Sequence, residues 1–291
     1  MVTPEAGAEA GNLLDQVSAE GLLGPGRPVL VLLSGGRDST CLLGLAVHIC
    51  GADSVSALHV NYGMRDSAER DQSHCAELCR RLGVRLQIRR PEHPHAGNLQ
   101  AWAREERYTA AAAELAAGRG TDVAVGHTAT DQVETILYRL ASSPSRRALL
   151  GMKPRDGAVI RPLLRYTRAQ TAAWCAEQGL EWCEDDTNDS DVFARGRIRS
   201  ELVPAFRTIH PGAERNVIAV AEILREEAAV ELARLRRLPL PLARLVVQRL
   251  ADRASGSLAP GVARRTPEVL ALREDRTAML DVGAGVRAVA E

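Results

Sequence analysis

Lysine is almost missing from this chain of 291 residues: Lys153 is the only one, so arginine carries nearly all the positive charge. Basic and acidic residues balance, and the formal net charge is zero. A generally basic surface is therefore excluded, and any nucleic-acid partner must be bound by local basic patches.

Paired cysteines and long apolar runs are missing too. None of the six cysteines forms a Cys-x-x-Cys pair, which excludes the usual frameworks of zinc ribbons, iron–sulfur clusters and dithiol redox sites. No apolar run approaches the length of a membrane span, and the N-terminus lacks the basic cluster of a secretory signal. We therefore expect a cytoplasmic protein with reduced thiols and no membrane partner.

The strongest local pattern runs from Pro28 to Thr40. Five consecutive apolar residues lead into Ser34-Gly-Gly-Arg-Asp-Ser39, and apolar residues at helical spacing continue to Cys50. An apolar run without alternation predicts a buried central strand. A glycine turn between a strand and a helix aims backbone N–H groups at one point, which suits an anion.

This loop differs from two common phosphate loops. No lysine follows the glycines, as Gly-x-x-x-x-Gly-Lys-Ser/Thr would require, and Gly-x-Gly-x-x-Gly is absent. Asp38 has two interpretations at this point: it holds a metal ion or orients phosphates, or it caps the following helix.

Strands and helices alternate along the first half of the chain, which predicts an α/β fold with a doubly wound, mostly parallel sheet. Ligands in such sheets bind beyond the carboxyl ends of the strands. Polar residues cluster at these points: 34–39, 59–65 and 127–134. The further expected strands are 54–60, 84–88 and 121–125, and the expected helices are 67–82, 98–117 and 129–141.

The remaining chain predicts three parts. Residues 1–24 form an N-terminal segment with a short helix, 25–212 a catalytic domain, and 213–291 a small, mainly helical region. Within the catalytic domain we expect short apolar patches between turns over 142–165, a helix over 168–178 capped by Thr167, and a helix from 193 that ends before Pro204. The last region contains a connector helix over 213–237, a helix over 240–251 and a hairpin over 278–289.

Seven further motifs follow the glycine loop in order. They are His59-Val-Asn-Tyr-Gly-Met-Arg65, Asn98-Leu-Gln-Ala-Trp-Ala-Arg-Glu-Glu-Arg-Tyr108, Gly126-His-Thr-Ala-Thr-Asp-Gln-Val-Glu-Thr135, Gly151-Met152, Arg161-Pro-Leu-Leu164, Glu184-Asp-Asp-Thr-Asn188 and Arg195-Gly-Arg-Ile-Arg199. The set covers residues 27–207 and resembles the tRNA(Ile)-lysidine synthetases, a branch of the N-type ATP pyrophosphatases with a PP-loop and an adenine nucleotide α-hydrolase-like fold.

The resemblance implies a ligase that uses ATP and Mg²⁺. Such enzymes adenylate C2 of the wobble cytidine in a CAU-anticodon tRNA(Ile). The ε-amine of free L-lysine then displaces AMP and gives lysidine. The partners implied are that tRNA and free lysine, and the sequence leaves monomer and homodimer open.

The resemblance also implies site residues. Asp131 and Glu134 lie three apart on an expected helix, so they share a face, and by resemblance they bind the lysine amines. Arg195 and Arg199 lie four apart and could bind the lysine carboxylate, the phosphates or the tRNA backbone. The expected nucleotide-binding residues are Ser34, Gly35, Gly36, Arg37, Asp38, Ser39, His59 and His127, with Asp38 also for the metal; the expected catalytic residues are Asp38, Asp131, Glu134 and Arg195.

Other assignments stay open. Asp185 and Asp186 either help with metal or lysine or form a plain acidic turn, and the helix carrying Arg104, Arg107 and Tyr108 either faces tRNA or supports the fold. Two candidate basic rims for tRNA are Arg146, Arg147, Lys153, Arg155, Arg165 and Arg168, and Arg234, Arg236 and Arg237.

The chain also departs from the family pattern. Thr130 stands where an acid is usual, and residues 141–145 replace a glycine-rich loop. Two alternatives therefore remain: a tRNA thiolase of the same loop class, which would need paired cysteines, and a nucleotide-dependent tRNA-binding protein with a degenerate site.

Overall fold

The computed structural model describes residues 13–63, 67–92, 99–142, 146–183, 194–255, 261–272, 278–283 and 286–290. Six strands form the main sheet in the order β3-β2-β1-β4-β6-β5, and every neighbouring pair is parallel except β5 with β6. The predicted α/β fold with a mostly parallel sheet is confirmed. The strands are β1 (Val29–Leu32), β2 (Val55–Val60), β3 (Arg85–Arg89), β4 (Asp122–Ala124), β5 (Arg155–Asp156) and β6 (Val159–Ile160).

The apolar strand β1 lies at the centre of the sheet and is buried along its whole length. Alternate side chains of a strand point to opposite faces. Val29 and Val31 pack into the larger core cluster, and Leu30 and Leu32 pack into a second cluster with Ala111 of α4. Both faces of β1 are therefore covered, which explains why its sequence shows no polar alternation.

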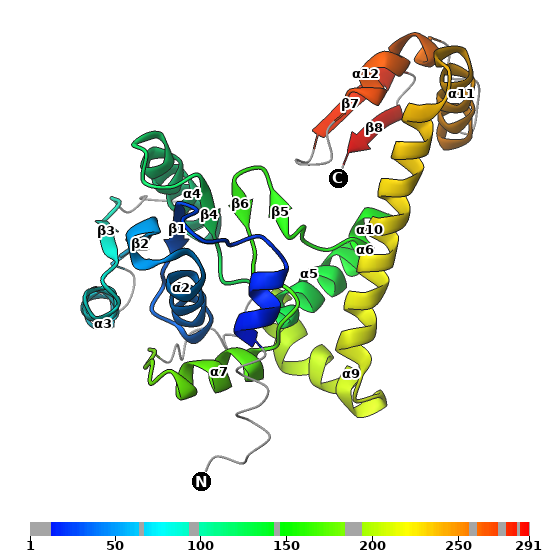
Figure 1. Ribbon diagram of the computed structural model, residues 1–291. Coiled ribbons are helices and arrows are strands. Elements are labelled where there is room, and N and C mark those ends of the chain that lie inside the picture. The colour runs from blue at the N-terminus through cyan, green and yellow to red at the C-terminus, as the bar shows by residue number, and fades with distance from the viewer. Residues whose placement is uncertain are drawn as a thin grey trace.

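Helices cover the two faces of the sheet (Figure 1). The larger cluster joins β1 to α2 (Arg37–Cys50), α3 (Ala68–Leu82), α7 (Arg168–Glu177) and helical residues 13–19. The opposite face is covered by α4 (Leu99–Ala116). The remaining helices of this part are α5 (Ala129–Ser142), α6 (Arg146–Leu149), α8 (Ala194–Arg197) and α9 (Val203–Ile209), with a 3-10 turn at Ala52–Ser54.

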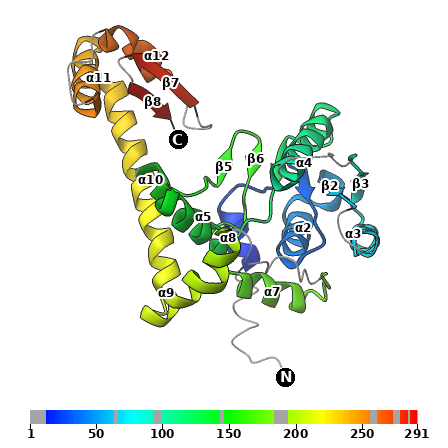
Figure 2. The same ribbon diagram turned by 180° about the vertical axis from the view of Figure 1, so that it is seen from behind.

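The C-terminal region extends away from the sheet along α10 (Ala213–Arg237), as Figures 1 and 2 show from opposite sides. One end of α10 packs on α5, α6 and α9, and the other end contacts α11 (Leu240–Ser255) and α12 (Thr266–Leu270). A 3-10 turn at Val262–Arg265 and a hairpin of β7 (Ala278–Gly283) and β8 (Val286–Ala290) complete this region. Among the described helices, none has the length and apolar character needed to cross a membrane.

Two expectations for the second half of the catalytic part are wrong. The short apolar patch at Val159 is strand β6, which hydrogen-bonds to β4 in the main sheet. The helix expected to end before Pro204 continues instead: a π-helical turn over Ile198–Leu202 leads into α9, and Pro204 occupies its first turn. Proline is tolerated there because a first-turn N–H has no partner within the helix anyway.

Candidate active site

The glycine loop between β1 and α2 is braced by its own serines. The Ser34 N–H donates to Ser39 Oγ at 3.2 Å, the two hydroxyl oxygens lie 3.0 Å apart, and the Ser39 hydroxyl donates to the Gly36 carbonyl at 2.9 Å. Gly35 has a φ of +89°, a left-handed conformation that favours glycine. The loop is therefore preformed, and the first turn of α2 presents its N–H groups above it.

Asp38 does not cap α2, because the N-cap is Gly36 and no side chain caps the helix there. Its carboxylate is held from a distant part of the chain: Oδ1 accepts from the Thr171 hydroxyl at 2.7 Å, and Oδ2 lies 3.7 Å from Nε of Arg168. Arg37 Nε also donates to Oδ1 at 3.1 Å. The capping interpretation of Asp38 is therefore wrong, and its carboxylate is fixed at the edge of the loop by α7.

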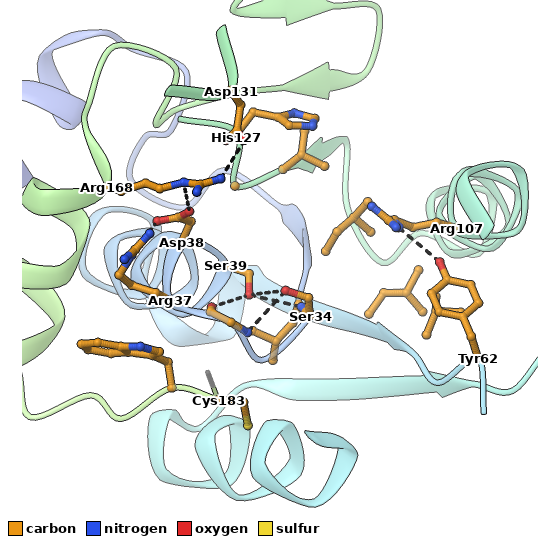
Figure 3. A pocket seen from close by; sticks show the side chains of 18 of the residues that line it. Ser34, Arg37, Asp38, Ser39, Tyr62, Arg107, His127, Asp131, Arg168 and Cys183 are labelled. Carbon is orange, nitrogen blue, oxygen red and sulfur yellow. Dashed lines mark hydrogen bonds and ion pairs between the residues drawn. The ribbon is translucent and has the colours of Figure 1, made fainter. Parts of the chain in front are cut away.

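A cavity of about 500 Å³ opens directly above this loop, and Figure 3 shows the side chains around it. We call it the loop cavity. Gly126, at the end of β4, lies so close that a Cβ there would be 3.1 Å from the Asp38 backbone. The polar lining of the loop cavity comes from the loop and from strand ends and helices nearby: Ser34, Arg37, Asp38, Ser39, Tyr62, Arg107, His127, Asp131, Arg168, Cys183 and Arg199.

Asp131 lies at the start of α5 and folds back onto its own helix. Oδ2 accepts from both the backbone N–H and the hydroxyl of Thr128, each at 2.8 Å. Oδ1 accepts from Arg168 Nη2 at 3.2 Å. Burial raises the pKa of Asp131, but the Arg168 guanidinium and the Thr128 N–H outweigh it and hold that pKa below its usual value.

Glu134 lies one turn further along α5 and is almost completely buried, with 4% of its side chain exposed. Both of its oxygens accept from Arg199, from Nε at 2.6 Å and from Nη2 at 3.0 Å. Such a bidentate pair is strong and directional. The expected lysine-binding acid Glu134 therefore already has a cationic partner within the chain.

A second cavity, of about 430 Å³, adjoins the loop cavity. His127, Asp131 and Arg199 line both cavities, so these side chains form the wall between them. Arginines dominate the lining, and two acids lie at the second cavity alone, Glu134 and Asp156. The floor also carries Gly151 and Met152, whose backbone is held by the Gln132 side chain through bonds of 2.6 Å and 2.9 Å to Met152.

The two histidines predicted for the nucleotide lie in different places. His127 lines both cavities, and burial lowers its pKa to about 4, although the Asp131 carboxylate acts in the opposite direction. His59 is buried under the loop, where its Nδ1 lies 2.9 Å from the Leu33 carbonyl. Burial lowers the pKa of His59 as well. His59 contacts the backbone at the start of the loop and does not line either cavity. A contact between His59 and a nucleotide therefore stays a prediction.

The remaining predicted residues divide into three groups. Arg195 lies in α8, but its side chain falls outside the described part, as do Asp185 and Asp186 altogether. Arg107 and Arg104 line the loop cavity and the second cavity respectively. Members of the first basic rim are mostly engaged elsewhere: Arg155 pairs with Asp122 at 2.6 Å, Arg165 with Glu222 at 2.6 Å, and Lys153 lines the second cavity, whereas the side chains of Arg146 and Arg147 are not described.

Arg168 and Thr171 are site residues that the sequence analysis missed. Arg168 was predicted to lie in a basic rim for tRNA, and no role was predicted for Thr171. Both lie in the first turn of α7, three residues apart, and this spacing puts them on one face. The predicted cap Thr167, confirmed with Gln170 as a reciprocal capping box, fixes where that turn begins. The sequence signal that could have identified them is a basic residue and a hydroxyl residue on one face of the first turn of a helix.

A known family matches most of the chain. The sequence profile of the PP-loop domain matches residues 10–206. The chain belongs to the PP-loop family. Membership of this family implies the use of ATP.

Curated relatives confirm the resemblance seen in the motifs. The chain is 34% identical over 232 residues to the tRNA(Ile)-lysidine synthase of Dehalococcoides mccartyi (strain CBDB1), which covers 74% of this chain and 49% of the relative. It is 37% identical over 211 residues to the enzyme of that name from Parabacteroides distasonis, covering 70% and 47%. The chain spans about half the length of these relatives.

A solved structure shows the same fold at low identity. The U34-tRNA thiolase NcsA from Methanococcus maripaludis, with its [4Fe-4S] cluster, aligns with a TM-score of 0.61 at 15% identity, over 75% of this chain and 80% of that one. This likeness establishes the PP-loop fold and leaves the reaction to the site residues.

Proposed function

We propose that this PP-loop chain ligates free L-lysine to C2 of the wobble cytidine of a CAU-anticodon tRNA(Ile), through an adenylated cytidine, and releases AMP and pyrophosphate. The observation that carries the proposal is the wall shared by the two cavities. Its acid Asp131 faces both the place for the nucleotide and the adjoining cavity, where an amine and a base would meet.

The loop cavity fits the first half-reaction. Backbone N–H groups, the Ser34 and Ser39 hydroxyls and Arg37 surround the place where pyrophosphate would leave with negative charge. Donors already fixed in position need no reorganisation as that charge develops. The braced loop therefore suits cleavage of ATP between its α and β phosphates.

The residues fit a magnesium ion brought by the nucleotide. Within the described residues no group of three or more His, Cys, Asp or Glu side chains could hold a metal, whereas Asp38 offers one carboxylate beside the loop. Mg²⁺ at phosphate sites commonly takes one or two carboxylates and otherwise phosphate and water oxygens. Bound there, the ion would neutralise charge on the phosphates.

The second cavity fits the second half-reaction. Lysine carries two ammonium groups and a carboxylate. Its pocket therefore needs carboxylates to bind the ammonium groups and a positive charge to bind the carboxylate. Asp131, Glu134 and Asp156 supply the carboxylates, and the arginines of the lining supply guanidinium donors for the lysine carboxylate. The wobble base would enter splayed from its stack, as single-stranded bases do in enzymes that modify them.

The thiolase alternative is less well supported by the cysteines. Cys75 and Cys79 are buried in the core, as their helix face predicts. Cys183 lines the loop cavity, but burial and the neighbouring Asp71 raise the pKa of its thiol to about 11. A thiol that ionises so reluctantly is a poor sulfur nucleophile near neutral pH.

We assign residues 213–291 to tRNA contact, with residues 25–212 as the catalytic domain and 1–24 as an N-terminal segment. Support comes from α10, which starts beside α5 of the catalytic part and carries exposed arginines at its far end, Arg234 and Arg237.

The decisive experiment is incorporation of labelled lysine into a CAU-anticodon tRNA(Ile) transcript, with and without ATP. We expect ATP-dependent labelling that disappears when the wobble cytidine is replaced. Release of AMP without lysine incorporation would point to another nucleophile, with sulfur the first candidate. No labelling and no AMP would favour the binding protein. With Asp38→Ala we expect no AMP formation.

A further inference from the structure

Five charged side chains alternate in sign from the loop cavity to the second cavity. Arg168 lies between Asp38, at 3.7 Å, and Asp131, at 3.2 Å, as Figure 3 shows. Arg199 in turn lies between Asp131, at 3.7 Å, and Glu134, at 2.6 Å. We call this set the charge row. It connects the glycine loop at one end with the second cavity at the other.

The carboxylate oxygens of the charge row are not equally well bonded. Both oxygens of Glu134 are taken by Arg199 at 3.0 Å or less, and Oδ2 of Asp131 is taken by Thr128. Among the described residues, Oδ1 of Asp131 has the longer contacts, 3.2 Å to Arg168 and 3.7 Å to Arg199. If Arg168 moved away, Oδ1 of Asp131 would be the acceptor set free in the shared wall.

Arg168 is also the least committed cation of the row. Its Nε is buried and has no hydrogen-bond acceptor among the described residues, and Asp38 stands 3.7 Å away from it. The Thr171 hydroxyl and Arg37 already occupy Oδ1 of Asp38, at 2.7 Å and 3.1 Å. A guanidinium with an unused N–H group beside a phosphate cavity would gain a charge-assisted bond from a polyphosphate.

We propose that Arg168 is a positioning residue that exchanges partners when ATP binds. Without nucleotide it holds Oδ1 of Asp131. The phosphates of ATP draw its guanidinium toward the loop, and the released oxygen then accepts an ammonium group of the amino-acid substrate. This inference rests on the proposed function and adds an order to it: ATP strengthens the binding of lysine before any chemistry occurs.

The exchange replaces one cation by another beside Asp131. The row holds three carboxylates and two guanidinium groups, so it carries one excess negative charge. With the triphosphate bound, Arg168 pairs with a phosphate and an ammonium takes its place beside Asp131, so Asp131 keeps a cationic partner, whereas an ammonium alone must compete with Arg168 for the same oxygen. The two ligands are therefore coupled, and lysine must strengthen ATP binding by the same factor.

The test measures binding of labelled lysine by equilibrium dialysis without tRNA. Each protein is measured with and without MgCl₂ and α,β-methylene ATP. This analogue cannot be cleaved between its α and β phosphates. For the unaltered protein we expect roughly tenfold tighter lysine binding with the analogue, within the usual range of coupling between sites. Arg168→Gln should bind lysine tightly in both states, because Asp131 has lost its competitor.

Two further variants separate this exchange from damage to the fold. Arg168→Lys keeps a cation and should keep part of the coupling. Arg207→Gln removes another arginine ion pair, with Glu214 at 2.7 Å, that lies outside both cavities, and it should behave as the unaltered protein does. The reciprocal measurement, affinity for the analogue with and without lysine, needs no variant at all.

Equal lysine affinity with and without the analogue in the unaltered protein would overturn the inference while leaving the proposed function standing. Coupling that persists unchanged in Arg168→Gln would overturn it as well. Absence of lysine binding in every state, with the analogue still bound, would overturn the proposed function along with it.

Discussion

Glu134 shows how much a single buried carboxylate is committed before any substrate arrives. It is 4% exposed, and both oxygens are bonded to Arg199. Removing one partner of such a pair leaves the other charge without compensation, a costlier change than the modest net gain of forming the pair.

We therefore expect Glu134→Ala to weaken lysine use and also to destabilise the fold, by about 3 kcal/mol. Urea unfolding followed by circular dichroism measures the second effect. Glu77→Ala is the matched control, because Glu77 pairs with Arg80 on an exposed helix face and its loss should leave the midpoint unchanged. Equal midpoints for the two variants would mean that Glu134 contributes nothing as an ion-pair partner.

His127 links the site to pH. Burial lowers its pKa to about 4, so in the folded protein it stays neutral where an unfolded histidine becomes protonated. Between these two pKa values the unfolded state binds more protons, and stability is therefore present above about pH 6.5 and lost as the pH falls toward 4.

For His127 alone we expect a loss of about 2 kcal/mol in unfolding free energy between pH 7 and pH 5. His127→Gln should remove that part of the pH dependence, as measured by urea unfolding at the two pH values. Parallel pH profiles for the variant and the unaltered protein would contradict the prediction.

At the scale of elements, α2 packs closely on α7 beside the candidate site. Gly44, in the middle of α2, faces Trp174 and Leu180 so closely that a Cβ there would lie 2.7 Å from the indole and 2.8 Å from Leu180. The same packing brings Thr171 within hydrogen-bond distance of Asp38.

Gly44→Ala should push α7 away, lower stability by about 2 kcal/mol and weaken binding of α,β-methylene ATP. Thermal unfolding and calorimetric titration measure the two effects. Gly24→Ala is the control, because nothing lies within 4 Å of a Cβ at Gly24. If Gly44→Ala unfolded earlier but bound the analogue normally, the position of α7 would not matter to the nucleotide.

The sequence predicted those elements whose signals are local. An unbroken apolar run, a glycine turn and a helical period together indicated β1, the loop and α2. The helical course of the chain through Pro204 could not be predicted. The π-helical turn before Pro204 packs on α5, and the local sequence carries no signal for that contact. The role of Arg168 was predicted wrongly for a similar reason. The sequence shows where the capped helix begins, but it does not show which carboxylates Arg168 will contact.

At the scale of the whole molecule, α10 places positively charged side chains far from the candidate active site. Arg234 and Arg237 are exposed at its far end, whereas Arg236 donates to the carbonyls of Leu270 and Leu272 and so anchors α12. Two members of the second predicted basic rim are therefore exposed, and Arg236 has a structural role; contact of the rim with tRNA stays a prediction.

We expect Arg234→Ala with Arg237→Ala to weaken tRNA binding and to lower the slope of log K against log salt by about 0.7–0.9 for each phosphate that the two arginines no longer neutralise. Filter binding at several salt concentrations provides the slope. Arg85→Ala on the edge strand β3, at the opposite side of the molecule in Figure 1, should leave the slope unchanged. An unaltered slope in the double variant would remove α10 from the tRNA interface.

The bond from Thr171 to Asp38 joins residues that are 133 positions apart. A ribosome adding roughly 5–20 residues per second needs about 7–27 s to make that stretch. For the first part of this time, until β4 is made, β1 has no neighbouring strand on the β4 side, and α7 is absent until the end of it. Until β4 arrives, the central strand has an open edge, and an unpaired edge is where an unfinished chain can pair with another chain.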